Sequence, residues 1–431
     1  MRLRRAIAAL ALVAATTAPG MGAGTVAVPA HVLTWYYDGL NGVNAGVPPA
    51  AMARYADFAE DDAGNDPAHL EAFKRAGGRF AVAYTDPAYA PYCFPPFSRP
   101  AGRCEGPVGR LLGDDEDAFF HGRDGTRVRR FVDNHFQYQE ALNPKSAAAR
   151  RAWRTTGEQI VRNAPQLDYF LADDAGSPLH ARDMSPKSSV FYNFNDAGIE
   201  IRSDEEFRDA WIGYITAAPR PMFVNGYDPG TGLPSYGGAF LRAPGVVGEV
   251  HESCFRAPEG IATDVNDRWR FVADSLLANT AFARYAVCFM MGRPTPPTRA
   301  YALASWWITY DARWSIAAPI DAQPGQSAVF PEFDIVPRAP IRTAAGRVAA
   351  LREGNAYVRE FGACYERREP IGPCAAIVNP TALPLPLPHL MLHYAHALVL
   401  DDADVFAGGR AKFARAIPAT LAPASALVLG P

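Results

Sequence analysis

The sequence predicts an α/β fold: a (β/α)₈ or TIM barrel followed by a small C-terminal β-sandwich. Short apolar runs alternate with stretches of helical spacing over about three hundred residues, which is the pattern of a parallel sheet with crossover helices. Seven or eight such units fit a closed barrel better than an open sheet. No glycine-rich dinucleotide or phosphate loop follows any of the strands, and such a loop would indicate the open sheet.

Seven short apolar runs predict barrel strands. They span residues 31–39, 54–58, 78–87, 167–174, 221–229, 245–253 and 284–292, and the eighth strand is expected in residues 328–336. Between them, residues 67–77, 143–165, 203–219 and 264–283 carry apolar side chains at helical spacing. Asn143 before Pro144 predicts the start of one helix, and Ser203 with Glu206 has the form of a capping box at the start of another.

The pattern changes after about residue 355, where Pro, Gly and Asp turns separate short alternating segments. Such a pattern is typical of an all-β module. We therefore expect the barrel over residues 25–354 and the sandwich over residues 355–431, packed on the barrel.

Residues 1–24 have the features of a secretory signal peptide. Arg2, Arg4 and Arg5 precede an apolar run over residues 6–15, and small residues follow near residues 21–23. This run is too short to span a bilayer, and no later segment is apolar enough to do so. The arginine pair would also fit the twin-arginine route, although basic residues occur in any such signal. We expect a soluble protein, secreted or periplasmic.

The cysteine spacing fits an oxidising compartment. Cys93 and Cys104 bracket a Pro-rich loop, and Cys364 and Cys374 bracket a second excursion, so each spacing suits a disulfide. The remaining two, Cys254 and Cys288, form either a third pair or buried thiols.

Composition excludes several classes of partner. The formal net charge is −3 and no dense Lys/Arg run occurs beyond the N-terminus, so the chain lacks the basic field that nucleic acid requires. No CxxC, Cys/His cluster or HExxH spacing indicates a metal, and no cofactor is expected. A monomer is the default expectation.

Polar and aromatic side chains gather where the predicted strands end. In a barrel of this kind, the carboxyl ends of the strands face the active site. No G-x-S-x-G elbow accompanies them. The side chains expected there are Tyr37, Asp38, Asp57, Tyr84, Asp86, Asp173, Asp174, Asn225, Tyr227, Glu249, His251 and Glu252.

Paired carboxylates without metal or phosphate machinery indicate glycoside hydrolysis. One carboxyl group protonates the leaving oxygen while the other attacks the anomeric carbon or activates water. Aromatic residues at strand ends suit stacking on sugar rings, so the expected substrate is a poly- or oligosaccharide. Each acid also has a structural alternative, because an Asp after a strand often caps a helix or closes a turn. For His251, contact with a sugar or a carboxylate and a purely structural hydrogen bond are equally good interpretations.

Residues 168–174, DYFLADD, resemble the DGxFLDN strand of retaining barrel glycoside hydrolases. The group includes α-amylase-like, dextranase-like and α-galactosidase-like enzymes and the bacterial hypothetical glycosyl hydrolase families. The resemblance puts Asp168 at the leading Asp, Asp173 at the nucleophile and Asp174 at the Asn. Tyr169 stands where the family often has Gly.

Two further segments resemble parts of these enzymes. Residues 245–255 resemble the later strand that carries the general acid, and residues 375–381 with 419–429 resemble the β-sandwich that follows the barrel. The resemblance implies a retaining two-carboxylate mechanism. A carboxyl separation of roughly 5 Å would support retention, whereas roughly 6.5–9.5 Å would indicate inversion.

Strand alternation separates the neighbouring acids. Asp173 and Asp174 point to opposite sides of a regular strand, so only one of them can face the pocket. Asp173, which the resemblance puts at the nucleophile position, is preferred, and Asp174 is expected to be a turn or substrate contact. Glu249 and Glu252 also differ in parity. Glu252 is nearer the carboxyl end of its strand and is preferred as the general acid/base, with Glu249 as the alternative.

Two other functions are compatible with these residues. A barrel that binds carbohydrate without catalysis would have carboxylates that never reach one bound sugar. A polysaccharide deacetylase or lyase would need a metal or a Tyr/His/Arg base set, which the sequence does not assemble.

Overall fold

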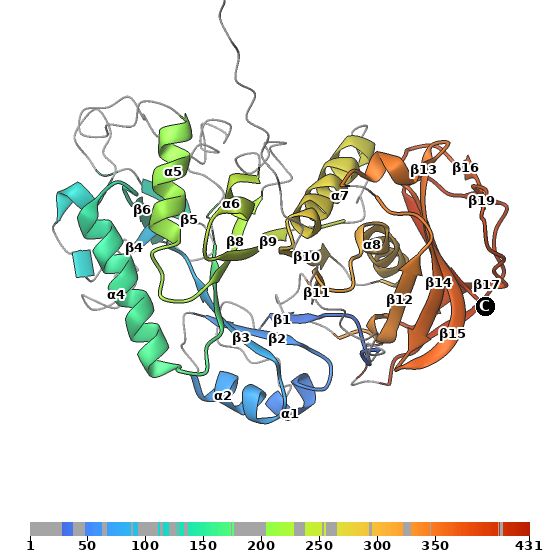
Figure 1. The fold of residues 1–431 in the computed structure, drawn as a ribbon, viewed down its shortest axis with the longest axis horizontal. Coiled ribbons are helices and arrows are strands. Elements are labelled where there is room, and N and C mark those ends of the chain that lie inside the picture. Colours follow the sequence, from blue (N-terminus) through green and yellow to red (C-terminus); the bar gives the residue numbers. More distant parts are fainter. Residues whose placement is uncertain are drawn as a thin grey trace, which may run out of the picture.

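The chain folds into a parallel barrel with an antiparallel β-domain beside it (Figure 1). The computed structural model describes residues 28–37, 48–62, 67–87, 89–93, 111–112, 115–119, 127, 129–132, 137–173, 175, 204–227, 238–251, 254–255, 265–292, 295–321, 329–344, 346–403, 405 and 408–431. The expected signal peptide, residues 1–24, lies outside this part of the chain.

Eight parallel strands form the barrel, in chain order around the sheet. The circle closes between its first and last strands, where Thr34 bridges Ala317 and the Ala317 N–H donates to the Leu33 carbonyl at 2.9 Å. The predicted fold class is confirmed. The strands are β1 (Trp35–Tyr37), β2 (Phe58–Asp62), β3 (Phe80–Thr85), β7 (Tyr169–Ala172), β8 (Met222–Tyr227), β9 (Val246–His251), β10 (Tyr285–Gly292) and β11 (Ser315–Asp321).

Helices cover the outside of the barrel (Figure 1). The helix expected over residues 143–165 begins later than predicted, because Ser146 and not Asn143 is its N-cap: the Ser146 hydroxyl accepts from the Ala149 N–H at 3.2 Å. The predicted cap at Ser203 lies outside the described residues. The helices are α1 (Pro49–Met52), α2 (Pro67–Arg75), α4 (Ala147–Asn163), α5 (Asp204–Ile215), α6 (Ala239–Arg242), α7 (Val265–Ala281) and α8 (Pro296–Thr309).

Apolar side chains fill the barrel interior. Trp35 stacks on Phe58 with ring centroids 5.3 Å apart and meets Phe223 edge-on at 4.8 Å. Val82, Leu171, Val250, Val287 and Ile316 belong to the same buried cluster. The residues in this cluster identify the inward-facing positions of each strand.

Two strand positions differ from the sequence prediction. Strand β2 begins at Phe58, where the predicted run ended. The eighth barrel strand is β11 and not residues 328–336. Part of that segment forms the 3₁₀ turn η4 (Pro331–Asp334), and β12 (Ile335–Pro340) then pairs antiparallel with a strand of the other domain. Both segments are short and apolar, so local pattern alone does not distinguish them.

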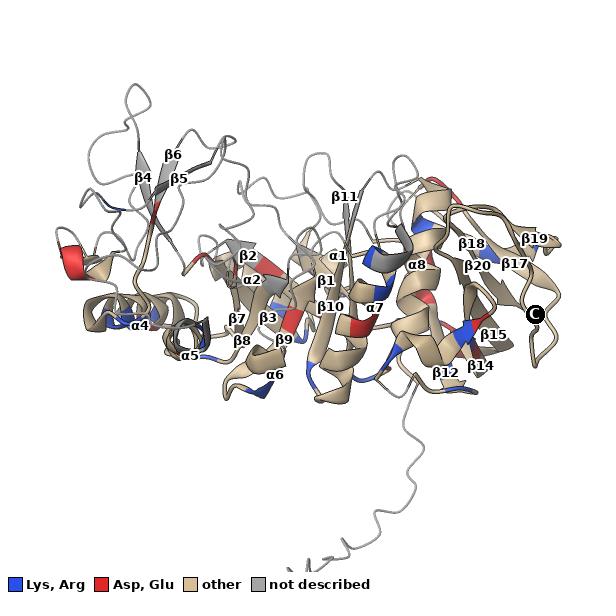
Figure 2. Cartoon of the chain, turned by 90° about the horizontal axis from the view of Figure 1, so that it is seen from above, with Lys and Arg blue, Asp and Glu red and all other residues tan. Residues whose placement is uncertain are grey.

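An insertion between β3 and β7 carries a second small sheet. Strands β4 (Tyr89–Cys93), β6 (Gln137–Ala141) and β5 (Arg129–Val132) pair antiparallel in that order, and η1 (Glu116–Ala118) lies between β4 and β5 along the chain. Both views show this sheet on the α4 side of the molecule, at the opposite end from the C-terminal β-domain (Figures 1 and 2). Arg127 joins it to η1, since its guanidinium pairs with Glu140 at 2.8 Å and Glu116 at 2.5 Å.

The C-terminal domain contains a seven-stranded antiparallel sheet, which begins with β12, before the expected boundary at residue 355. One face packs on α8, which contacts β15 and β20 and buries Trp306 and Trp307. The other face holds a smaller apolar cluster with a two-stranded sheet. The remaining elements are η5 (Val348–Leu351), β13 (Arg352–Glu353), β14 (Ala356–Glu366), β15 (Glu369–Asn379), β17 (His396–Leu400), β18 (Ala411–Arg415) and β20 (Ser425–Gly430), with β16 (Leu385–Pro386) paired to β19 (Thr420–Leu421).

A buried ion pair links the two domains. The Arg299 guanidinium of α8 donates to both carboxylate oxygens of Glu332, at 2.8 and 2.5 Å, and to the Asp401 carbonyl at 2.6 Å. The two charged side chains are 6% and 1% exposed, so neither charge is solvated by bulk water.

Two disulfides lie in the described part of the chain. The predicted Cys364–Cys374 pair is confirmed, and Cys254 pairs with Cys288. The Cys93–Cys104 prediction involves side chains outside the described set. No helix among the described residues is both long and apolar enough to cross a membrane.

Candidate active site

Asp173 is held at the carboxyl end of the barrel by the strands on either side of it. Its backbone N–H donates to the Thr85 carbonyl at 2.8 Å, which extends the pairing of β7 with β3. One carboxylate oxygen accepts a hydrogen bond from the Tyr84 hydroxyl of β3, and the other accepts from the Asn225 amide of β8 at 2.7 Å. Because both oxygens have a donor, the plane of this partly exposed carboxylate is fixed.

Alternation along β7 explains why Asp173 points inward. Leu171, two residues earlier, belongs to the interior cluster, so the next position of the same parity reaches the barrel mouth. Tyr84 and Asn225 follow Val82 and Phe223 in the same way on their own strands. The structure therefore brings together three predicted site residues: Asp173, Tyr84 and Asn225.

Strand β9 contains an irregularity that reverses its parity. Met222 pairs with Val246, but the next residue, Phe223, pairs with Gly248, so β9 has one extra residue. A side chain at Gly248 would collide with the Tyr285 carbonyl of β10, so only glycine allows this close approach. As a result, Val247 and Val250 both contact the barrel interior.

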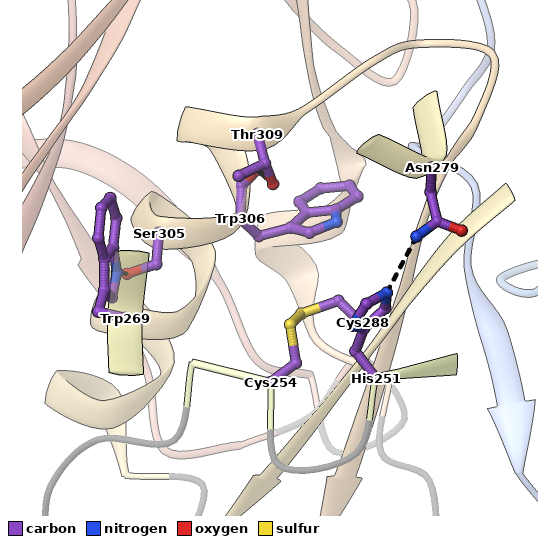
Figure 3. Close-up of a disulfide and its surroundings, with 8 residues drawn as sticks. All are labelled: His251, Cys254, Trp269, Asn279, Cys288, Ser305, Trp306 and Thr309. Atoms are coloured by element: carbon purple, nitrogen blue, oxygen red, sulfur yellow. Dashed lines mark hydrogen bonds between the residues drawn. A yellow bond between two sulfur atoms is a disulfide. The ribbon is translucent and has the colours of Figure 1, made fainter. Parts of the chain in front are cut away.

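Glu249 and His251 consequently face away from the barrel interior, toward α7. Glu249 is 1% exposed and accepts a hydrogen bond from the Asn279 amide at 3.1 Å. His251 is fully buried, and its Nε2 atom lies 3.2 Å from the nitrogen of the same amide (Figure 3). Neither side chain lies in the barrel mouth, which corrects the expectation that His251 contacts substrate. Glu252 lies outside the described residues.

Burial governs the protonation of His251. It lowers the pKa of the imidazole to about 3, so the ring is neutral at ordinary pH. The Asn279 Nδ2 atom can only donate, so the His251 Nε2 atom must be the acceptor and its proton lies on Nδ1.

The remaining predicted residues divide into two groups. Asp86 is partly buried and close to Tyr214, whose pKa is raised by burial and by the Asp86 charge. The Tyr214 hydroxyl donates to the Pro87 carbonyl at 2.8 Å. For the others, either the side chain or the whole residue lies outside the described set: Tyr37, Asp38, Asp174 and Tyr227.

Asp57 and Asp168 lie at the opposite end of the barrel. Asp57 pairs with Arg79 at 2.9 Å, and Asp168 accepts from Lys74 and from the Ala81 N–H, each at 2.8 Å. Both precede their strands, so they fix strand starts and cannot reach the carboxyl-end mouth. The expectation that Asp57 ends a strand is wrong, because β2 begins one residue after it.

Glu60 is an interior carboxylate that the sequence analysis missed. It lies on β2, is 1% exposed and accepts from the Trp35 indole N–H at 2.7 Å. The sequence signal for an inward-facing Glu60 is its spacing of two residues from the apolar Phe58, and this spacing is informative only when the strand is placed over residues 58–62. Among the residues that the structure describes, no group of three or more His, Cys, Asp or Glu could hold a metal ion.

No protein-family model matches the chain, and no curated protein matches it. The solved structures that match include glycoside hydrolases and sugar-transfer enzymes. The glycoside hydrolase domain of PelA from Pseudomonas aeruginosa shares 13% identity over 67% of this chain and 93% of its own, with a TM-score of 0.40. A mutant of the trehalulose synthase MutB shares 10% identity over 93% of this chain and 99% of its own, with a TM-score of 0.45. An α-amylase from Malbranchea cinnamomea shares 12% identity over 89% of this chain and 87% of its own, with a TM-score of 0.38.

Proposed function

We propose that the protein is a secreted glycoside hydrolase that cleaves O-glycosidic bonds of a poly- or oligosaccharide by a retaining two-carboxylate mechanism. Asp173 is the nucleophile and Glu252 the general acid/base. The observation that carries the proposal is the fixed, partly exposed carboxylate of Asp173 at the barrel mouth, with a donor on each oxygen.

The geometry of Asp173 suits attack on an anomeric carbon. A nucleophilic carboxylate gains most when its orientation is set before the substrate binds, because little freedom is then lost in the transition state. Tyr84 and Asn225 provide this orientation from two different strands. Neither of these two donors brings a full positive charge.

Glu252 is preferred over Glu249 as the acid because of the side to which β9 turns its residues. Glu249 is directed toward α7, whereas Val250 is directed into the barrel. In the sequence Glu252 also lies nearer the carboxyl end of this segment than Glu249, and the carboxyl ends of barrel strands carry the catalytic groups. Tyr37, Asp38, Asp86 and Asp174 are then candidate contacts for the sugar.

Two disulfides support export, because such bonds persist in oxidising compartments. Expression of the full chain with N-terminal sequencing of the exported product tests this part. Cleavage near residue 24 is expected, and an uncut cytoplasmic product would contradict export.

Activity is tested by incubating purified residues 25–431 with a panel of bacterial and plant polysaccharides. Release of reducing sugar by the natural sequence, and its loss in Asp173→Asn, is the expected result. Binding of a polysaccharide without turnover by either protein would instead support the non-catalytic carbohydrate-binding barrel. Loss of activity on adding a chelator would favour a metal-dependent deacetylase or lyase.

The roles of the carboxylates are separated by leaving-group dependence. A glycosyl fluoride of the sugar identified in the panel needs little acid assistance in the first step, so Glu252→Gln should keep close to the wild-type kcat/KM on it while losing the polysaccharide reaction. Its kcat on the fluoride should fall, because the same residue is the general base of the second, hydrolytic step. Asp173→Asn should lose both reactions. The anomer released first, observed by NMR, decides between retention and inversion.

A further inference from the structure

Two aromatic side chains of α5 reach the strand ends that hold Asp173. Trp211 and Tyr214 are both fully buried, and their rings stack with centroids 5.4 Å apart and planes inclined by 17°. In a close-packed interior neither ring can turn without displacing the other. The stack therefore sets the positions of the two polar groups that it carries, an indole N–H and a phenol hydroxyl.

Each of these polar groups donates to a backbone carbonyl just beyond a barrel strand. The Tyr214 hydroxyl donates to the Pro87 carbonyl at 2.8 Å, two residues after β3 ends at Thr85. The Trp211 indole donates to the Ala175 carbonyl at 2.7 Å, three residues after β7 ends. Pro87 and Ala175 are buried, and a buried carbonyl needs a donor, so α5 stabilises the exits of both strands.

The same two strand ends fix the proposed nucleophile. Tyr84 of β3 donates to the Asp173 carboxylate, and the next residue, Thr85, accepts from the Asp173 N–H at 2.8 Å. Pro87 lies only two residues further along, so a shift of this strand exit would move both contacts. The exit of β7 would stay tied to α5 through Ala175, so the two strand ends would move relative to each other.

We propose that Tyr214 is a positioning residue for the nucleophile. Through its bond to the backbone beyond β3, it holds this strand end and thereby keeps Tyr84 and Thr85 in contact with Asp173. Burial raises the pKa of the Tyr214 phenol, and so does the charge of Asp86, so the hydroxyl stays protonated and can donate at ordinary pH. This inference rests on the proposed function, in which Asp173 is the nucleophile.

Tyr214→Phe tests this role, because it deletes the hydroxyl and keeps the ring. Every substrate needs the attack by Asp173, so kcat/KM should fall by roughly tenfold on both the polysaccharide and the glycosyl fluoride, within the hundredfold that about 1 Å of misplacement can cost. One hydroxyl is a small part of the stability of a folded domain, so the variant should fold, which urea denaturation checks. An unchanged kcat/KM, or a loss confined to the polysaccharide, would overturn the proposal.

Thr216→Val is the matched control. Thr216 lies two residues after Tyr214, and its hydroxyl donates to the Ile212 carbonyl of α5 itself at 2.7 Å. This variant loses the same kind of bond without releasing a barrel strand, so both values of kcat/KM should stay at the wild-type level. An equal fall in Thr216→Val would attribute the effect to a loosened helix and sink the positioning role.

The pH profile gives a readout that a loss of stability alone would not move. The hydrogen bond from Tyr84 favours the ionised Asp173 carboxylate, so weakening this bond makes the carboxylate easier to protonate. The acidic limb of kcat/KM on the glycosyl fluoride should therefore move to higher pH in Tyr214→Phe, as in Tyr84→Phe. The double variant should move it no further than Tyr84→Phe alone. An acidic limb that stays in place in Tyr214→Phe would contradict the proposal.

Hydrogen exchange measures the same contact without a substrate. The Asp173 amide, which donates to Thr85, should exchange faster in Tyr214→Phe than in the natural sequence, and at the natural rate in Thr216→Val. Equal acceleration in all the barrel strands would indicate general loosening and refute the positioning role. The proposed function fails in a different way: the natural sequence would cleave nothing in the panel, or Asp173→Asn would stay active, and the inference would then fail with it.

Discussion

His251 should cause the protein to lose stability as the pH falls below about 6.5. In the unfolded chain this imidazole has an ordinary pKa of 6.5, whereas burial in the folded protein lowers it to about 3. Between these values the unfolded state binds the additional proton and the folded state does not. The free energy of unfolding therefore rises with pH through this window, and its contribution is fully present only above it.

The magnitude follows from the two pKa values. At pH 7 about three-quarters of the unfolded imidazole is neutral, and at pH 5 nearly all of it is protonated. The folded imidazole stays neutral at both pH values. The linkage relation then gives a loss of unfolding free energy on the order of 2 kcal/mol between pH 7 and pH 5 from this one group.

Urea denaturation at pH 7 and pH 5 measures this loss without any substrate. His251→Gln should remove it, so the variant should be the less pH-sensitive protein even if it is less stable at pH 7. His393, exposed on the C-terminal domain, provides the matched control, and His393→Gln should run parallel to the natural sequence. Equal pH dependence in wild type and His251→Gln would refute a buried neutral imidazole.

Three other outcomes are expected. Tyr84→Phe removes one donor to the Asp173 carboxylate, worth about 1.5–3 kcal/mol, and should lower kcat/KM roughly ten- to hundredfold; Thr85→Val, which loses only a bond to the Leu171 carbonyl, should not. Replacing both cysteines of Cys254–Cys288 by Ala should lower the free energy of unfolding, measured by urea denaturation, by about 1 kcal/mol more than replacing those of Cys364–Cys374. The first pair is 34 positions apart in the sequence and the second 10, so the first disulfide closes the longer loop; the reverse order would contradict the loop-entropy argument. Arg299→Met should cost about 3–5 kcal/mol by leaving Glu332 buried without its cation, and adding Glu332→Leu should recover most of it; a double variant as unstable as the single would contradict this explanation.

The sequence was sufficient where the pattern was local. The alternation along this strand predicted that Asp173 shares a side with Leu171 and that only one of the two neighbouring aspartates can face the barrel mouth; in the structure Leu171 lies in the interior cluster and Asp173 bonds to Tyr84 at the strand end. The sequence also placed Tyr84 and Asn225 with Asp173, because both lie near the carboxyl ends of predicted strands, and these ends meet at one rim of a barrel. The Cys364–Cys374 pair was readable for the same reason: both residues bracket a single short excursion.

The pattern failed where two segments looked alike. Residues 328–336 and 315–321 are both short and apolar, and only pairing shows that β11 closes the barrel while β12 joins the other sheet. Glu60 was overlooked because the strand was predicted over residues 54–58, whereas β2 spans Phe58–Asp62 and contains Glu60. In both cases the missing information was a contact between residues distant in the chain.

The sequence by itself determined the alternation of strands and helices, the change to an all-β segment and the opposite directions of Asp173 and Asp174, because each depends on a period carried by neighbouring residues. The direction of Glu249 and His251 was decided only by the tertiary structure. The extra residue of β9 lies between Val246 and Gly248 and reverses the parity of the strand residues after it, and glycine at 248 permits the close approach to β10, because a side chain there would collide with the Tyr285 carbonyl. The residue pattern within β9 does not indicate this close approach, since the Tyr285 carbonyl belongs to another strand.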